Sequence, residues 1–414
     1  MTDEGILSPA AVADPYPFFA RLRESDPVCW DERYRSWFIT SYSENELAVR
    51  DVRFSSDRIT PVIEKERRRA NPDRGLIETL EQLDGWMVFR DPPDHLRLRR
   101  LVHRAFTPRM VAAMREQVVA MTDELLDAAE LDAAATDGTV DLLRAVAYPL
   151  PAIVIAGMLG VPPEDRDQFK EWSDDISALV FGGMEDPSRH ERARAGMSHL
   201  VTYVTALVER ARRDPRDDLA TALVQAHDED GALSEAEVVA TCVNILFGGH
   251  ETTTNLIANG VLALLQHREQ ARLLREDPGL APVAVEEILR YDGPAKAVVR
   301  VAAEDLDLLG RRISAGDRVF LLPAAANRDP AVFERPDELD VTRHPNPHLG
   351  FGAGMHYCLG ASLARLEGAV AIPRILERFP QLRLTDQPLT WKPALLTRGL
   401  DTLPVQVAST TCAL

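Results

Sequence analysis

An uninterrupted helical pattern, mostly apolar, runs from Ser234 to about His267. It begins with a capping box, in which Ser234 caps the backbone amide of Glu237 and the Glu237 side chain bonds back to the serine. At a rise of about 1.5 Å per residue, the predicted helix is roughly 50 Å long. A helix of that length crosses a whole domain, so the remaining elements must pack around it.

The centre of this predicted helix has an unusual composition, since residues 248–254 read GGHETTT. Each interior glycine costs about 1 kcal/mol relative to alanine, and β-branched threonines are also poor helix formers. One interpretation is close packing against a neighbouring helix, with the threonine hydroxyls bonded to the preceding turn. The other is a groove in which a ligand approaches the backbone.

Helical patterns dominate the rest of the chain, which has 414 residues, 45% of them hydrophobic. Proline and glycine are spread evenly, and no repeat or low-complexity linker divides the sequence. We therefore expect one mainly α domain over residues 1–414, with small β-sheets. The strand-like runs are 28–30, 37–40, 298–302, 318–322 and 403–407.

Charge and cysteine usage argue against several classes of protein. The net charge of −18 disfavours binding to nucleic acid or to anionic lipid. The four cysteines show no CxxC spacing, which disfavours a disulfide framework or a zinc module and favours a cytoplasmic protein. Residues 145–161 are uncharged, but they are too short for a membrane span and Pro149 and Pro151 interrupt them. We expect a buried helix there, beginning near Pro151.

Residues 351–360 read FGAGMHYCLG and lead into a predicted amphipathic helix. The glycines let the backbone pass close to a flat, bulky group. Cys358 lies at the start of the helix, where free amides and the positive end of the helix dipole favour a thiolate over a thiol. The loop therefore predicts a cysteine with a chemical role.

This string resembles the heme-binding loop of the cytochrome P-450 family, and three further motifs match the family in order. The GGHETT run resembles its oxygen-activation motif, and Glu287-Ile288-Leu289-Arg290 resembles its ExxR element. Residues 91–100 (DPPDHLRLRR) are similar to the propionate-contacting helix of soluble bacterial members. The match extends over nearly the whole chain, from residues 14–17 to the tail.

The resemblance implies the cytochrome P-450 fold, with heme b (iron protoporphyrin IX) buried between the long central helix and the helix after the cysteine loop. Cys358 would be the axial iron ligand, and its thiolate would favour O–O bond cleavage. The heme propionates need cationic partners in a largely apolar pocket. The residues that the resemblance assigns to them are His95, Arg99, Arg300 and His356.

The ExxR element predicts a structural ion-pair network. Glu287 and Arg290 lie one helical turn apart and can form a charge-assisted pair. The family implies a third member, an arginine in the segment before the heme loop. Arg343 is the better match, and Arg335 is the competing assignment.

Glu251 and Thr252 are the expected catalytic residues. Monooxygenation needs protons delivered to bound dioxygen while bulk water is excluded, and a hydroxyl backed by a carboxylate meets that need. Gly248 stands where the family usually has alanine, which leaves more room above the iron.

Electrons must come from a separate protein, because the sequence has no GxGxxG after a strand and no cysteine cluster. The stretch from His95 to Arg115 holds six arginines, two histidines and no carboxylate. This local reversal of charge predicts a docking surface for an acidic partner, and the family implies a ferredoxin with a ferredoxin reductase. In the alternative interpretation, these arginines serve the propionates and the solubility of the helix.

The family's substrate-contacting segments give a mostly apolar pocket with two polar groups. Asn244 could bond a substrate carbonyl or hydroxyl, or a neighbouring backbone group. Lys296 could pair with a substrate carboxylate, although a solvent-exposed side chain is the ordinary expectation for lysine. The predicted pocket residues are Trp86, Val88, Phe89, Val180, Phe181, Asn244, Phe247, Gly248, Lys296, Val298 and Leu396.

The resemblance thus implies a heme-thiolate monooxygenase that inserts one oxygen atom from dioxygen into an organic substrate, by hydroxylation or epoxidation. The arginine-rich sequence suggests bacterial secondary metabolism, such as antibiotic biosynthesis. Two alternatives stay open: the same heme site performing coupling or desaturation, and a non-catalytic heme sensor. The intact GGHETT run argues against the sensor.

Overall fold

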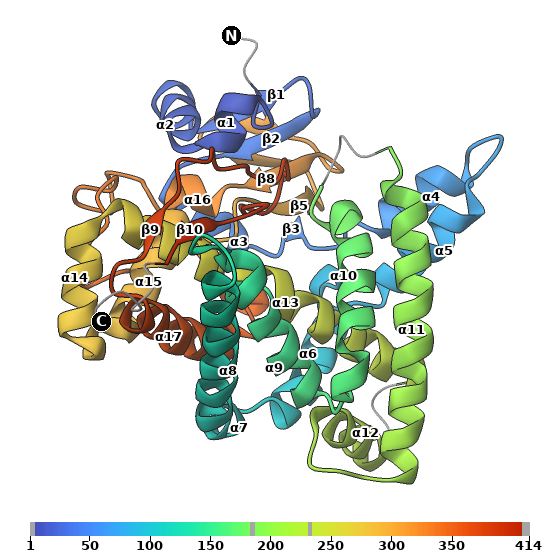
Figure 1. Ribbon diagram of the computed structural model, residues 1–414. Coiled ribbons are helices and arrows are strands. Elements are labelled where there is room, and N and C mark those ends of the chain that lie inside the picture. The colour runs from blue at the N-terminus through green and yellow to red at the C-terminus, as the bar shows by residue number, and fades with distance from the viewer. Residues whose placement is uncertain (1–4, 183–186, 231–233, 408–414) are drawn as a thin grey trace, which may run out of the picture.

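Helix α13 (Glu235–Gln266) runs through the centre of the computed structural model, which describes residues 5–182, 187–230 and 234–407 (Figure 1). Both hydrogen bonds of the predicted capping box between Ser234 and Glu237 are present. The helix has 32 residues, which corresponds to about 48 Å. Most of its side chains are buried, because other elements surround it on nearly every side.

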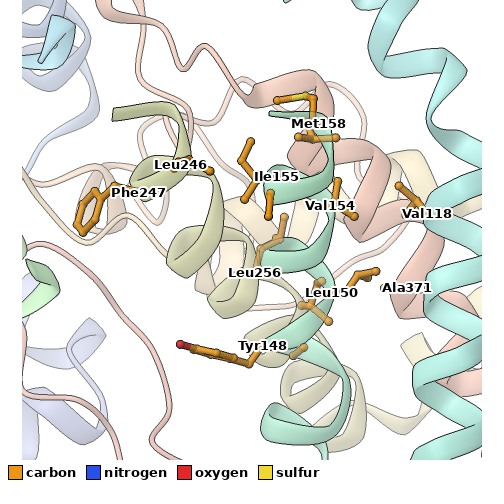
Figure 2. Close-up of a cluster of buried hydrophobic side chains, with 14 of the residues drawn as sticks. Val118, Tyr148, Leu150, Val154, Ile155, Met158, Leu246, Phe247, Leu256 and Ala371 are labelled. Atoms are coloured by element: carbon orange, nitrogen blue, oxygen red, sulfur yellow. The ribbon is translucent and has the colours of Figure 1, made fainter. Parts of the chain in front are cut away.

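Helix α9 (Pro149–Met158) is one of the elements that pack against α13. Its sequence is apolar throughout, so it is buried on almost every face. Figure 2 shows Ile155 of α9 lying between the two helices, near Leu246 and Leu256, whereas Phe247 points away from α9. The prediction of a buried helix is confirmed, and its first residue is Pro149, where proline is well tolerated.

The other helices enclose α13 or connect it to the sheets (Figure 1). Helices α11 (Arg189–Arg213), α15 (Ala281–Asp292) and α17 (Ala361–Arg378) also contact it directly. The remaining helices are α1 (Pro9–Ala13), α2 (Tyr16–Ser25), α3 (Tyr42–Arg50), α4 (Thr60–Arg67), α5 (Arg74–Asp84), α6 (Asp94–Ala105), α7 (Pro108–Ala113), α8 (Arg115–Ala134), α10 (Arg166–Val180), α12 (Leu219–Asp230), α14 (Arg268–Glu276) and α16 (Pro323–Ala326). Short helical turns occur at η1 (Met87–Phe89), η2 (Leu143–Ala147), η3 (Pro163–Asp165), η4 (Pro278–Leu280) and η5 (Gly354–His356).

Three small sheets lie outside the helical part in the described chain. The largest has the strand order β1-β2-β8-β5-β3, in which β2 and β8 are parallel and the other neighbours are antiparallel. The second has the order β4-β10-β9, and β6 pairs with β7. The strands are β1 (Val28–Asp31), β2 (Ser36–Ile39), β3 (Phe54–Ser55), β4 (Thr139–Asp141), β5 (Val298–Ala302), β6 (Leu306–Leu308), β7 (Arg311–Ile313), β8 (Arg318–Leu321), β9 (Arg383–Leu384) and β10 (Pro404–Gln406).

The mainly α fold with small sheets agrees with the sequence prediction. All five predicted strand-like runs form strands, each to within one residue at either end. Strands β5 and β8 belong to the sheet that places the N-terminal and C-terminal parts of the chain side by side (Figure 1). No helix in the described ranges is both long enough and apolar enough to cross a membrane.

Candidate active site

The glycine-rich loop before α17 presents Cys358. Gly352 and Gly354 have φ values of 68° and 66°, the left-handed conformation that glycine adopts without strain. They fold the loop so that the amide of Cys358 donates to the carbonyl of Phe351 at 2.9 Å. Gly360 then occupies the N-cap of α17. The loop therefore presents a free cysteine that is accessible to a ligand.

The predicted preference of Cys358 for the thiolate form is only partly right. Burial raises the pKa of the thiol, and this outweighs the backbone amides of Gly360 and Ala361 and the guanidinium groups of Arg99 and Arg365, which lower it. The residue is exposed at the surface, although nearby protein atoms desolvate its thiol. The net direction is a raised pKa, because desolvation is the largest of these effects.

The four residues predicted to contact propionates come together from separate elements. His95 and Arg99 lie one turn apart on α6, Arg300 lies in β5, and His356 lies just before Cys358. The rings of His95 and His356 are 4.0 Å apart between centroids. Arg99 donates to the carbonyl of Tyr357 at 2.7 Å, which ties α6 to the cysteine loop.

Arg58 is a fifth member of this cluster, and no motif in the sequence points to it. Its guanidinium lies 4.9 Å from the centre of the Phe89 ring. Burial and the charge of Arg300 lower the pKa of Arg58 to about 10. Burial likewise lowers the pKa of Arg300 to about 10, that of His95 to about 4 and that of His356 to about 3, and neighbouring cations in the cluster lower both histidine values further. The five groups therefore share a site where positive charge is poorly compensated.

Anions from the protein do not balance this cluster in the described part of the chain. Neither Arg58 nor Arg300 forms an ion pair there, and the Nδ1 atom of His95 is buried without a hydrogen-bond partner. Asp91 acts on Arg300 electrostatically, but it accepts hydrogen bonds from Ser55 and from the amide of Ser56. The donors therefore suit a ligand that brings its own carboxylates.

The two adjacent glycines of α13 have different surroundings. A Cβ atom on Gly249 would lie 3.0 Å from Ile155 of α9, so this glycine allows close helix packing. A Cβ atom on Gly248 would meet nothing within 4 Å, and Gly248 is exposed although Phe247 before it is buried. Gly249 thus fits the interpretation of close helix packing, and Gly248 fits that of a groove in which a ligand approaches the backbone. One turn later, the Thr252 hydroxyl donates to the Gly248 carbonyl at 3.1 Å.

Glu251 is buried and has one charged partner. Its Oε1 atom lies 3.6 Å from Nζ of Lys392, and its Oε2 atom has no hydrogen-bond partner within the described residues. The Lys392 side chain is 38% exposed, so it connects the buried carboxylate to solvent. This contact could not be predicted from the sequence, because Lys392 lies in the C-terminal segment, far from α13 in the chain.

Glu287, Arg290 and Arg343 meet in a buried network. The Arg290 guanidinium donates to both carboxylate oxygens of Glu287, at 2.7 and 2.8 Å, and both side chains are fully buried. The Nε atom of Arg343 lies 3.1 and 3.2 Å from the same two oxygens. The competing assignment to Arg335 is wrong, because Arg335 lies at the surface and bonds Glu338 instead.

A family model described as cytochrome P450 matches residues 57–278 and 280–400. The chain belongs to the cytochrome P450 family. It is 41% identical to the cytochrome P450 monooxygenase PikC of Streptomyces venezuelae, over 98% of this chain and 94% of that protein. It is 42% identical to the vitamin D(3) 25-hydroxylase of Pseudonocardia autotrophica, over 95% and 93%. The crystal structure of P450BioI in complex with hexadec-9Z-enoic acid ligated acyl carrier protein superposes with a TM-score of 0.87 at 37% identity, covering 96% of this chain and 98% of that one.

This P450 is a heme-dependent monooxygenase, as its similarity to bacterial hydroxylases and monooxygenases indicates. Like the family as a whole, it needs redox partners and binds small organic substrates. The residues of the site fit a heme, since the free thiol of Cys358 lies near cations that no carboxylate of the described residues pairs with. The exposed Gly248 lies in the middle of a mostly buried helix and leaves the backbone open to a ligand.

Four of the predicted pocket residues form an aromatic cluster next to Gly248 in this P450. The ring of Phe247 lies 5.0 Å from that of Trp86 and is stacked on Phe181 at 5.2 Å. Trp86 stacks on Phe89 at 6.1 Å. Trp86, Phe89 and Phe247 are nearly fully buried, whereas Phe181 is half-buried. The cluster provides a rigid apolar wall.

The other predicted pocket residues differ in exposure. Val180, Asn244 and Val298 are half-buried, Leu396 is buried, and Val88 is largely exposed. The Asn244 side chain makes no hydrogen bond within the described residues, so it does not bond a neighbouring backbone group.

The prediction that Lys296 is exposed is wrong, since only 3% of its surface is accessible. The amides of Lys296 and Ala297 both donate to the carbonyl of Leu396, at 2.9 and 3.1 Å. The C-terminal turn therefore holds this segment and covers it. Sequence composition could not reveal such a contact between distant segments.

The basic stretch from residue 95 to residue 115 also differs from its prediction in one respect. Arg97 is not available for docking, because its guanidinium bonds Glu237 of α13 and Asp94. Neither carboxylate lies inside the stretch. Arg100, Arg109 and Arg115 are exposed and form no ion pair within the described residues.

Proposed function

We propose that Cys358 is the axial ligand of heme b and that five cationic groups hold its propionates. These groups are His95, Arg99, Arg300, His356 and Arg58. The observation that supports this assignment is the cluster of cationic side chains near the free thiol of Cys358. Among the described residues, this cluster lacks anions that would balance its charge. Buried guanidinium groups are costly unless an anion compensates them, and two propionates would do so.

Bound at Cys358, heme iron supplies the activation of dioxygen. The residues of α13 would supply the protons that this chemistry needs. Glu251 takes up protons from solvent beside the half-exposed Lys392, and Thr252, its neighbour in the helix, holds a proton on its hydroxyl. Gly248 leaves the space that the substrate and dioxygen need. The buried aromatic wall around Phe247 excludes bulk water.

The network of Glu287, Arg290 and Arg343 has a structural role in this proposal. Arg290 also donates to the carbonyls of Asn327, Pro336 and Glu338, so it fixes the segment that leads to the cysteine loop. Glu287 and Arg290 are fully buried, and the Arg343 side chain is only 11% exposed. They position Cys358 without taking part in the oxidation.

We assign the electron supply to a ferredoxin reduced by a ferredoxin reductase. The exposed arginines Arg100, Arg109 and Arg115 are positive in a chain of net charge −18, and an acidic ferredoxin complements them. Arg99, which precedes Arg100 on α6, donates to the loop of Cys358, so a donor docked there would lie close to this loop.

The substrate is an organic compound of bacterial secondary metabolism that becomes hydroxylated or epoxidised. The names of the relatives support this class, since they include a polyketide biosynthesis cytochrome P450 and 6-deoxyerythronolide B hydroxylase. The largely aromatic wall of the pocket suits an extended apolar skeleton.

The test is reconstitution of the holoenzyme with ferredoxin, ferredoxin reductase and NAD(P)H under isotopically labelled dioxygen. We expect products that carry one labelled oxygen atom and NAD(P)H consumption that depends on substrate. Oxygen derived from water, or no oxidation of any compound in a panel of polyketides, steroids and fatty acids, would contradict the proposal.

The ferredoxin assignment has its own test. The double variant Arg100→Glu with Arg109→Glu should slow ferredoxin-supported turnover about tenfold at low salt, whereas reduction by dithionite should not change. Arg383→Glu, an exposed arginine on β9, is the matched control. Equal ferredoxin-supported rates in the double variant and the control would contradict docking at this surface.

A further inference from the structure

Lys296 is a buried lysine without a partner that explains its burial. Only 3% of its surface is accessible. Within the described residues, its ammonium makes neither a hydrogen bond nor an ion pair. The charged group that acts on it is Arg398, which has the same sign. A buried ammonium in these surroundings is unfavourable unless an anion reaches it.

The other buried lysine and arginine side chains of the described chain have anions or a role in the heme site. Arg290 pairs with Glu287 at 2.7 Å, Arg328 with Asp337 at 3.2 Å, and Arg398 with Asp292 at 2.5 Å. Arg300 belongs to the cluster assigned to the propionates. Lys296 is therefore the exception among the buried cations.

The acidic groups of the neighbouring segments are already used. Asp292 accepts hydrogen bonds from the Tyr16 hydroxyl at 2.6 Å and from Arg398. Glu251 pairs with Lys392. Burial and the charge of Arg398 together lower the pKa of Lys296 to about 7, and the described protein supplies no carboxylate that would raise it.

Lys296 is joined by backbone contacts to the wall of the proposed substrate pocket. Its amide donates to the Leu396 carbonyl, and the Leu396 amide donates to the Phe181 carbonyl at 3.1 Å. Phe181 in turn stacks on Phe247, which directly precedes the exposed Gly248. The backbone of Lys296 is thus connected through Leu396 to the aromatic wall beside Gly248.

We propose that Lys296 binds the carboxylate of the substrate, so that this P450 oxidises organic acids. The inference rests on the proposed function, because it assigns one contact in the same substrate site. The carboxylate would pair with the ammonium, and the apolar part of the acid would lie along Phe181 and Phe247 toward Gly248. An ester or alcohol of the same skeleton lacks the negative charge and leaves the ammonium uncompensated.

The test is a spectroscopic titration of the holoenzyme, in which substrate binding shifts the spin state of the heme. The probes are decanoic, dodecanoic and tetradecanoic acids, each paired with its methyl ester. We expect at least one acid to bind about tenfold more tightly than its ester. Lys296→Met should remove this preference and Lys296→Arg should retain it. Lys65→Met is the matched control, since Lys65 is an exposed lysine on α4.

The melting temperature of Lys296→Met distinguishes a loss of substrate binding from a failure to fold. Lys296→Met replaces an unpaired buried ammonium by an apolar side chain of similar length, so we expect its melting temperature to equal or exceed that of the wild type. A lower melting temperature would show a structural partner for Lys296 and overturn the proposal. Acids that bind no more tightly than their esters, or an unchanged preference in Lys296→Met, would also overturn it. Failure of the proposed function itself is distinguishable, because the reduced holoenzyme would then lack the carbon monoxide spectrum of a thiolate-bound heme.

Discussion

The ammonium of Lys392 lies 3.6 Å from the carboxylate of Glu251, although 141 positions separate the two residues in the sequence. The carboxylate is buried inside the longest helix, and the lysine is partly exposed in the C-terminal segment. The pair therefore connects solvent to the residue that precedes Thr252. This arrangement is what a supply of protons to a water-excluding site requires.

Removing the lysine should weaken this supply without abolishing it. The pair is partly exposed, and such pairs contribute about 0.2–1 kcal/mol, so Lys392→Met should lower the rate of product formation by up to about fivefold. The measurement is the steady-state rate with saturating ferredoxin and substrate, and substrate affinity should not change. Lys65→Met serves as the control. A Lys392→Met rate that matches this control would contradict a role for the lysine in positioning Glu251.

Removing the hydroxyl of Thr252 should divert the reaction toward peroxide. Thr252→Ala leaves Gly248 and the helix in place but deletes the group that holds the proton. We expect the peroxide released per product molecule to rise about tenfold or more, because proton delivery by a positioned group contributes at least that factor. Thr252→Ser should restore most of the coupling between NAD(P)H consumption and product. Unchanged coupling in Thr252→Ala would exclude the assigned role.

The two arginines that competed for the third position of the ExxR network should differ strongly in their effect on stability. Arg343→Ala leaves the buried carboxylate of Glu287 with one fewer partner and should lower the free energy of unfolding by about 3–5 kcal/mol. Arg335→Ala changes an exposed side chain and should cost less than about 0.5 kcal/mol. Urea unfolding followed by circular dichroism measures both. Similar losses in the two variants would show that the network does not depend on Arg343.

Alanine at Gly248 and at Gly249 of α13 should separate the roles of these two glycines. Both substitutions gain about 0.5–1 kcal/mol of helix propensity. At Gly248 the methyl group enters open space, so stability should rise while affinity for bulky substrates falls. At Gly249 the methyl group meets Cγ1 of Ile155 at 3.0 Å, so the gain should be lost. Equal stabilisation by both alanines, measured by thermal unfolding, would contradict this account.

The fold could be predicted wherever a local pattern determines it. The apolar periodicity and capping box predicted α13, and short β-rich runs predicted the strands to within one residue. The strand order of the largest sheet could not be predicted, because β2 and β8 pair in parallel across most of the chain. Such pairings depend on tertiary packing and leave no mark in the sequence near either strand.

The candidate site, too, could be predicted only where a local sequence pattern determines it. The motif at residues 351–360 predicted that Cys358 lies at the start of a helix, and helical spacing predicted that His95 and Arg99 share a face of α6. The raised pKa of Cys358 could not be predicted, because it reflects desolvation by residues from several elements. Arg58 has no motif around it, and the burial of Lys296 depends on a turn about one hundred residues later. Contacts between segments that are far apart in the chain could therefore not be predicted from the sequence.

A single spectrum can show whether Cys358 binds heme iron as a thiolate. The reduced wild-type holoenzyme should form a carbon monoxide complex with a strongly red-shifted Soret band, because the thiolate donates electron density to the iron. Cys358→Ser should lose this band while its circular dichroism stays that of the folded protein. An unshifted Soret band in the wild type, or a red-shifted band that persists in Cys358→Ser, would contradict the account.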